Sequence, residues 1–222
     1  MSAGLDIVFL DVGGPIYDEG PFARALLAAL RELGADVDEV EFRREYDCAR
    51  QAQARIRPRL AERFLGPDAD VAELSARAKR HWRYPPEALH ADVVPCLEQL
   101  SERYRIGLLA NQPEATRAAL VRDGVAPFVD LWVVSDEVGF EEPDPRIFAY
   151  ALEKAGCEPS EAAFVGDRLD VDMRPAKRAG LRTVWLLRGE APPEPTREQL
   201  AEPDVAIGSL RELPLALERL AA

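Results

Sequence analysis

Asp6-Ile-Val-Phe-Leu-Asp11-Val-Gly-Gly-Pro15 is the stretch of sequence that decides the fold. Its four apolar residues, Ile7 to Leu10, precede the acid Asp11, and two glycines and a proline follow soon after. A short apolar run that stops at a tight turn is typical of the strands of parallel sheets, which are buried on both faces. The stretch therefore predicts a buried parallel strand with Asp11 at its carboxyl end.

Beyond this stretch, apolar runs of similar length alternate with segments of helical pattern. The strand-like runs lie at residues 105–110, 131–135, 162–165, 183–187 and 205–207. Helical segments separate them, and the one at residues 93–103 leads directly into the strand that follows. This alternation predicts an α/β fold with a doubly wound parallel sheet.

The segment between the first two strands has a different pattern. From Pro21 to Tyr84 the sequence is helical, and one face of its first helix carries regularly spaced apolar residues, namely Phe22, Leu26, Leu27, Leu30 and Leu33. A second helical stretch covers residues 43–64, and we expect Pro58 to interrupt it. A third covers residues 71–82.

Charge separates the same segment from the rest of the chain. Residues 19–87 hold 13 basic and 13 acidic side chains, so the remaining residues carry the whole net charge of −12. We therefore expect a core made of residues 1–18 and 89–222, with residues 19–88 inserted after the first strand as a separate helical domain.

Composition excludes several classes of protein. With 47% hydrophobic and 31% charged residues, the chain has the composition of a globular protein and not of a fibrous or disordered one. Its apolar runs are too short to span a bilayer and its N-terminus lacks the features of a signal peptide, so we expect a cytoplasmic protein. The widely spaced Cys48, Cys96 and Cys157 are expected to be reduced. The acidic net charge argues against a nucleic-acid partner.

Acidic side chains dominate the positions at which the predicted strands end. Asp11 follows the first strand, and Asp167 and Asp172 follow the run at 162–165. In open α/β sheets, ligands bind at the carboxyl ends of the strands, so we expect these carboxylates to converge. Carboxylate oxygens suit Mg2+, which binds one or two of them and keeps several waters.

Four motifs, taken in order, resemble those of the haloacid dehalogenase (HAD) superfamily. Phe9-Leu-Asp11-Val-Gly-Gly-Pro-Ile16 is similar to the first motif, and Ala110-Asn111 stands at the second. Glu141-Glu-Pro-Asp-Pro-Arg-Ile-Phe148 is similar to the third, and Val165-Gly-Asp167 with Asp172 to the fourth, written GDxxxxD. The resemblance covers nearly the whole chain. It implies that residues 19–88 are the cap that closes over the substrate in this family.

The resemblance also implies a mechanism. Asp11 would attack a phosphoryl group and form an aspartyl-phosphate, which water then hydrolyses. Mg2+ would be held by Asp11, by the backbone carbonyl of Gly13 and by Asp167, with Asp172 in support. Asn111 keeps the catalytic residue that the family has at that position. The expected partner is accordingly a small phosphorylated molecule, and neither a nucleic acid nor a membrane.

Three positions depart from the family pattern. Gly13 replaces the usual acid/base Asp, Ala110 replaces a Ser or Thr that binds the phosphoryl oxygen, and Glu142 replaces a Lys that neutralises the nucleophile and the phosphate. The last exchange reverses a charge, and at about 4 Å in an effective dielectric near 20 each unit of charge is worth roughly 4 kcal/mol before relaxation. Either Glu142 points away, or another cation takes over, or phosphate is not the ligand.

Several arginines are candidates for the missing cation. Arg146 and Arg168 lie beside the third and fourth motifs. The insert holds a local excess of arginines, namely Arg43, Arg44, Arg50, Arg55, Arg57, Arg59 and Arg63. The spacing of Arg55, Arg59 and Arg63 predicts that they share one helix face, for which a solvated surface is the favoured interpretation.

Three functions are compatible with these observations. A magnesium-dependent phosphatase with weak or altered activity on a small phosphorylated metabolite is favoured, because Asp11, Asn111, Asp167 and Asp172 all remain. A non-catalytic HAD-like protein that binds or regulates is the alternative, because three catalytic positions have changed. A 2-haloacid dehalogenase is the outsider, since that chemistry needs no cation site.

Overall fold

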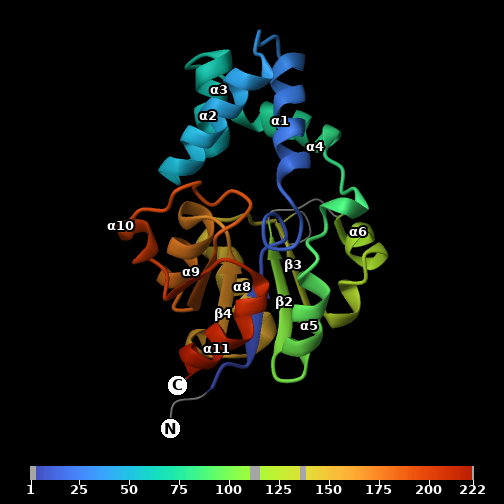
Figure 1. Cartoon of the computed structure of the whole chain (residues 1–222), viewed down its shortest axis with the longest axis vertical. Coiled ribbons are helices and arrows are strands. Elements are labelled where there is room, and N and C mark those ends of the chain that lie inside the picture. The colour runs from blue at the N-terminus through green and yellow to red at the C-terminus, as the bar shows by residue number, and fades with distance from the viewer. Residues whose placement is uncertain (1–3, 111–115, 136–138, 222) are drawn as a thin grey trace.

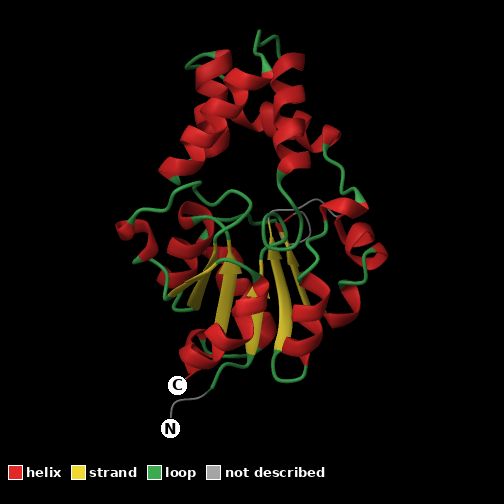
Figure 2. Ribbon diagram, viewed as in Figure 1, coloured by secondary structure: helices red, strands yellow, loops and turns green. Residues whose placement is uncertain are grey.

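The structure, a computed structural model, describes residues 4–110, 116–135 and 139–221 (Figure 1). Six strands form one sheet in the order β3-β2-β1-β4-β5-β6, and each neighbouring pair is parallel. The strands are β1 (Ile7–Leu10), β2 (Arg105–Ala110), β3 (Leu131–Val134), β4 (Ala162–Gly166), β5 (Arg182–Leu186) and β6 (Val205–Ile207). The predicted α/β fold with a doubly wound parallel sheet is thus confirmed (Figure 2).

β1 lies in the interior of the sheet because all its side chains are apolar and buried. Successive side chains of a strand point to opposite faces, so Val8 and Leu10 pack into one hydrophobic cluster and Ile7 and Phe9 into another. Helices cover both faces of the sheet (Figure 1). The first cluster lies under α5 (Val93–Ser101), α6 (Thr116–Arg122) and α11 (Leu213–Ala221), and the second under α8 (Pro145–Ala155) and α9 (Arg174–Arg178).

Short helical segments complete the connections. They are η1 (Pro86–Ala88), η2 (Ala126–Phe128), η3 (Pro159–Glu161), η4 (Leu169–Met173), α10 (Arg197–Leu200) and η5 (Leu210–Glu212). Within the described parts of the chain, we find no helix with both the length and the apolar character that a bilayer crossing requires.

Residues 20–81, which we call the helical unit, form a layer of helices above the carboxyl ends of the strands (Figure 1). The helices are α1 (Gly20–Glu32), α2 (Glu39–Ala52), α3 (Ile56–Leu65) and α4 (Val71–His81). Their buried side chains form a hydrophobic cluster of their own, to which the sheet contributes no residue. Side chains of Asp38 and Asp70 cap the N-termini of α2 and α4 by accepting backbone hydrogen bonds.

The break between α2 and α3 differs from the prediction. The chain turns at residues 53–55, where Gln53 and Arg55 have left-handed φ angles of 47° and 38°, whereas Pro58 lies inside the first turn of α3. A proline is tolerated there because the first N–H groups of a helix have no intrahelical acceptor. Arg55 precedes the helix, so the predicted face of three arginines is wrong: of Arg55, Arg59 and Arg63, the last two alone belong to α3.

Two connections join the helical unit to the core, and they run side by side. Asp18 N donates to Ala88 O at 2.8 Å and His90 N donates to Ile16 O at 3.1 Å. Between these two hydrogen bonds, Tyr17 and Leu89 form an antiparallel bridge. We call this pair of segments, residues 16–18 and 88–90, the stem.

Candidate active site

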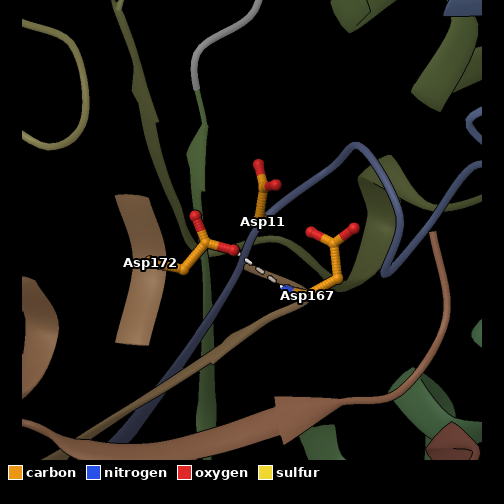
Figure 3. A group of neighbouring side chains, drawn as sticks. All are labelled: Asp11, Asp167 and Asp172. Atoms are coloured by element: carbon orange, nitrogen blue, oxygen red, sulfur yellow. Dashed lines mark hydrogen bonds between the residues drawn. The ribbon is translucent and has the colours of Figure 1, made fainter. Parts of the chain in front are cut away.

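The order of the strands brings two acids together at the carboxyl edge of the sheet. β1 and β4 are neighbours with Leu10 in register with Val165, so Asp11 and Asp167 leave the ends of adjacent strands. Asp172 comes from η4, which follows β4. Oxygens of the three carboxylates lie within 4.8 Å of one another, and Figure 3 shows the side chains as neighbours. The structure thus gathers three of the predicted site residues.

Asp172 holds the backbone that carries Asp167. Its Oδ2 atom accepts hydrogen bonds from the backbone N–H groups of Asp167 and Arg168, each at 2.9 Å, and the first of these is drawn in Figure 3. Gly166 leaves room for this contact, since a Cβ atom there would lie 2.4 Å from Asp172 Oδ2. η4 is a π-helical turn, a form of helix that occurs frequently at functional sites.

The Asp167 side chain is tightly enclosed and 2% exposed. Trp185 Nε1 donates to the Asp167 carbonyl at 2.9 Å, and Glu190 N donates to its Oδ2 atom. Gly14 and Gly189, both with positive φ, pack against the carboxylate, and a Cβ atom would lie 2.3 Å or 2.4 Å, respectively, from Asp167 Oδ2. Any larger residue at either glycine would displace this carboxylate.

A cavity of about 50 Å³, which we call the small cavity, lies at the carboxylates between the core and the helical unit. In this measure one water molecule needs about 10–15 Å³, so the cavity has room for one small group and not for a whole substrate. Two of the residues that line it are basic, Arg57 and Arg168. Six are acidic, namely Asp11, Glu19, Glu142, Asp167, Asp172 and Glu190.

Burial and mutual repulsion raise the pKa values of these carboxyl groups. Burial, followed by the charge of Asp172, raises the pKa of Asp11 well above its ordinary value. The same two causes act on the pKa of Asp167, and burial raises the pKa of Asp172 to about 7. Carboxylates that repel one another in this way are stabilised when a cation binds between them. The converging oxygens therefore fit a divalent ion such as Mg2+.

Glu142 lies inside the small cavity, which excludes the first of the three explanations that the sequence left open. Its side chain is buried and lines the cavity beside the acid cluster. Burial, and then the charges of Asp11 and Asp172, raise the pKa of Glu142 well above its ordinary value. The charge reversal at this position therefore acts directly on the site.

The two arginines that the sequence offered as cations have different environments. Arg168 lines the small cavity and forms ion pairs with Asp170 and Glu190 at 2.7 Å and 3.1 Å. Arg146 is exposed, pairs with Asp144 and covers the ring of Phe140. Because its guanidinium is held there, Arg146 is not among the residues that line the cavity.

The remaining predicted residues belong to the first two motifs. Gly13 lines the small cavity and pairs with Tyr17 in the loop after β1. Ala110 ends β2 at the same edge of the sheet. Asn111 lies outside the described residues.

The predicted site residues do not include six residues that line the small cavity, namely Glu19, Phe22, Arg57, Trp82, Val171 and Glu190. Glu190 follows β5, so the rule that drew attention to the other strand ends would have found it. Glu19 and Trp82 flank the helical unit, and Arg57 lies within it. Only the packing of the helical unit on the core reveals their proximity to Asp11.

Comparison with known proteins agrees with this geometry. A model of the haloacid dehalogenase-like hydrolase family matches residues 5–180. A glyceraldehyde 3-phosphate phosphatase of Methanopyrus kandleri is 32% identical over 219 residues, which are 93% of this chain and 94% of the relative. A phosphoserine phosphatase of Thermus thermophilus is 40% identical over 149 residues, which are 66% of this chain and 56% of the relative.

A solved structure gives the same result. A HAD phosphatase from Thermococcus onnurineus matches with a TM-score of 0.63 and 26% identity, over 96% of this chain and 98% of the other. Together with the acid cluster at the ends of β1 and β4, these matches identify the chain as a member of the haloacid dehalogenase-like hydrolase family, whose relatives named above are phosphatases.

Proposed function

We propose that this protein is a magnesium-dependent phosphatase that acts on a small phosphorylated metabolite. The observation that carries the proposal is the cluster of Asp11, Asp167 and Asp172, whose oxygens converge within 4.8 Å at the carboxyl edge of the sheet. In this proposal Asp11 is the nucleophile. Asp11, Asp167 and the Gly13 carbonyl would hold the ion, and Asp172 would support them. The ion would neutralise charge on the phosphoryl oxygens.

The Asp11 carboxylate would attack phosphorus in line with the leaving oxygen. The new O–P bond gives an aspartyl-phosphate as the bond to the leaving group breaks, and water then releases inorganic phosphate and restores the carboxylate. A hydrogen bond of 2.7 Å from Val12 N to Asp11 Oδ1 orients the nucleophile. Gly13 offers no proton to the leaving oxygen, and a general acid is worth about 10²–10⁴-fold, so we expect slow turnover.

We also propose that residues 19–88 act as a cap over the leaving group. A second cavity, of about 450 Å³, shares Arg57, Glu142, Arg168 and Val171 with the small cavity. The helical unit contributes apolar side chains to its wall, among them Ile56 and Val71. A volume of this size is usual for the binding of a small ligand. The phosphoryl group would occupy the small cavity and the rest of the metabolite the second.

The test is a phosphatase screen over a panel of phosphorylated metabolites with Mg2+. Glyceraldehyde 3-phosphate and phosphoserine belong on the panel, because the named relatives act on them. We expect phosphate release by the wild-type protein that stops on removal of Mg2+ and in the Asp11→Asn variant, which keeps the side-chain size but loses the nucleophile. Release that persists in Asp11→Asn would refute the proposed mechanism.

The second candidate is a HAD-like protein that binds without turnover. The observations in its favour are the residues at three positions, Gly13, Ala110 and Glu142, together with the location of Glu142 inside the small cavity. This candidate predicts Mg2+ binding with no phosphate release from any member of the panel. A dehalogenase remains the outsider, because an acid cluster that fits a cation has no use in that reaction.

A further inference from the structure

The small cavity contains more negative charge than its arginines can neutralise. Six acidic side chains face two basic ones, and Arg168 is already engaged. Its Nε and Nη2 atoms donate to Asp170 at 3.0 Å and 2.7 Å, and its Nη1 atom donates to Glu190 at 3.1 Å. Because Arg168 already pairs with two carboxylates, its charge is balanced within the protein. A second cation besides the metal ion would therefore strengthen the binding of a phosphoryl group in this cavity.

Arg57 is the other basic residue of the small cavity, and its donors are available. It is the second residue of α3, is half-buried, and its Cζ atom stands 4.8 Å from the centroid of the Phe22 ring. Such a contact with an aromatic face supports a guanidinium without using its N–H groups. Within the described parts of the chain, the Arg57 side chain forms no ion pair or hydrogen bond with another residue.

The position of Arg57 is fixed relative to the acids, although it belongs to the helical unit. Just before α3, Arg55 N donates to Asp170 Oδ2 at 2.8 Å, and Leu169 N donates to Gln53 Oε1 at 2.8 Å. Leu169 and Asp170 belong to η4, which also carries Asp172. The start of α3 is thereby tied to the same turn that orders the acid cluster.

We propose that Arg57 binds the phosphoryl oxygens of the substrate and supplies the positive charge that the core lacks at Glu142. Arg57 lines both the small cavity and the second one, so it stands where the phosphoryl group meets the leaving group. The guanidinium fork matches phosphate oxygens in pairs. This inference rests on the proposed phosphatase function. Because Arg57 belongs to the helical unit, the phosphoryl site has this positive charge only when the helical unit is packed against the core.

The first test is calorimetric titration with inorganic phosphate at saturating Mg2+. Arg57→Ala should weaken phosphate binding by roughly 10- to 100-fold, which is the effect of losing hydrogen bonds to a charged group. Arg57→Lys keeps the charge but not the forked guanidinium, so its affinity for phosphate should lie between those of Arg57→Ala and the wild-type protein. Arg59→Ala is the matched control, because Arg59 is exposed on the same helix and does not line either cavity. It should bind phosphate as the wild-type protein does.

A titration with Mg2+ alone separates this role from a structural one. Arg57→Ala should bind Mg2+ at least as tightly as the wild-type protein, since a positive charge has left an acidic site. Equal phosphate affinity in Arg57→Ala and wild type would overturn the assignment and leave the phosphatase proposal intact. Loss of Mg2+ binding together with phosphate binding would also overturn it, because Arg57 would then support the site as a whole. A wild-type protein that binds Mg2+ but no phosphate would instead refute the phosphatase proposal.

Discussion

At the scale of single residues, the chemistry of this protein depends on the balance of charge around Asp11. At Glu142 a carboxyl group occupies the position where the family has the ammonium of a lysine. Burial and the charges of Asp11 and Asp172 raise the pKa of this carboxyl group. Its neighbour Glu141 is exposed and lines the second cavity but not the small one, where inorganic phosphate would bind. These adjacent glutamates allow the effect of a buried charge to be separated from the effect of net charge.

Glu142→Lys should tighten the binding of inorganic phosphate at saturating Mg2+ by about tenfold or more, as expected for a charge-assisted hydrogen bond. Mg2+ itself should bind less tightly, because a cation now lies beside the carboxylates that hold it. Calorimetric titration measures both effects, and Glu141→Lys should show neither. If the wild-type protein is an active phosphatase and Glu142→Lys abolishes that activity, Glu142 takes part in the reaction as a base or a metal ligand.

At the scale of elements, the end of α2 is joined to two core loops by buried hydrogen bonds. Gln53, which is 1% exposed, donates from Nε2 to the Glu190 carbonyl at 2.8 Å and accepts at Oε1 from Leu169 N at 2.8 Å. Tyr46 of α2 donates from its hydroxyl to Glu190 Oε1 at 2.6 Å. These contacts connect the helical unit to the loops that follow β4 and β5.

Gln53→Ala should loosen this junction, because it leaves Leu169 N and the Glu190 carbonyl without their partner. Each buried group left unsatisfied costs about 1–3 kcal/mol. We expect faster hydrogen–deuterium exchange at residues 53–57 and 169–173, with the strands unchanged, and a lower kcat/KM. Gln51→Ala is the milder comparison, since the Gln51 side chain donates to the Glu194 carbonyl and accepts from Glu194 N at an exposed edge. Unchanged exchange in Gln53→Ala would mean that other contacts hold the helical unit in place.

The sequence was sufficient to predict the parallel sheet and insufficient to predict how the helical unit packs against the loops at its carboxyl edge. The strands follow from runs such as Ile7 to Leu10, whose burial on both faces requires apolar residues throughout. The sequence predicts an interruption of the second helical stretch at Pro58, but the chain turns at Gln53 and Arg55. Those two residues adopt left-handed φ angles where hydrogen bonds to η4 hold them. No local propensity reports such long-range partners.

Some residues of the candidate site could be predicted from the sequence, and others depend on how the helical unit packs. Asp11, Asp167 and Asp172 could be predicted because the order of parallel strands determines which strand ends meet. Arg57 could not be distinguished from the other arginines of the helical unit, since its role depends on where that unit rests. Arg146 seemed equivalent to Arg168 in the sequence, but it forms a local pair with Asp144 at the start of α8.

At the scale of the whole molecule, the acid cluster should weaken the fold in the absence of a metal ion. Buried carboxyl groups with raised pKa values cost stability when they ionise at neutral pH. Mg2+ at 100 times its dissociation constant should add about 2.7 kcal/mol. For a chain of this size, that corresponds to a rise in Tm of roughly 5–10 °C in a thermal melt.

Asp167→Asn should lose most of the Mg2+-dependent rise in Tm. Without Mg2+ at pH 7, the variant should melt at a higher temperature than the wild-type protein, because one of the repelling carboxylates is gone. Asp144→Asn is the matched control, since Asp144 caps α8 away from the cluster and asparagine caps helices equally well. A full Mg2+ effect in Asp167→Asn would place the ion elsewhere in the protein.

The stem has a consequence for how such proteins diversify. Asp18 and Ala88 are hydrogen-bonded neighbours, so residues 19–87 begin and end at adjacent points of the core. The inserted helices also keep their own hydrophobic cluster. An inserted segment of another length could therefore replace residues 19–87, or a short turn could join the two ends. The sheet that carries Asp11 and Asp167 would keep its strands in either case. If the helical unit acts as the cap that we propose, substrate preference could change by exchange of this one segment, provided that the new segment again supplies the cation that we assign to Arg57.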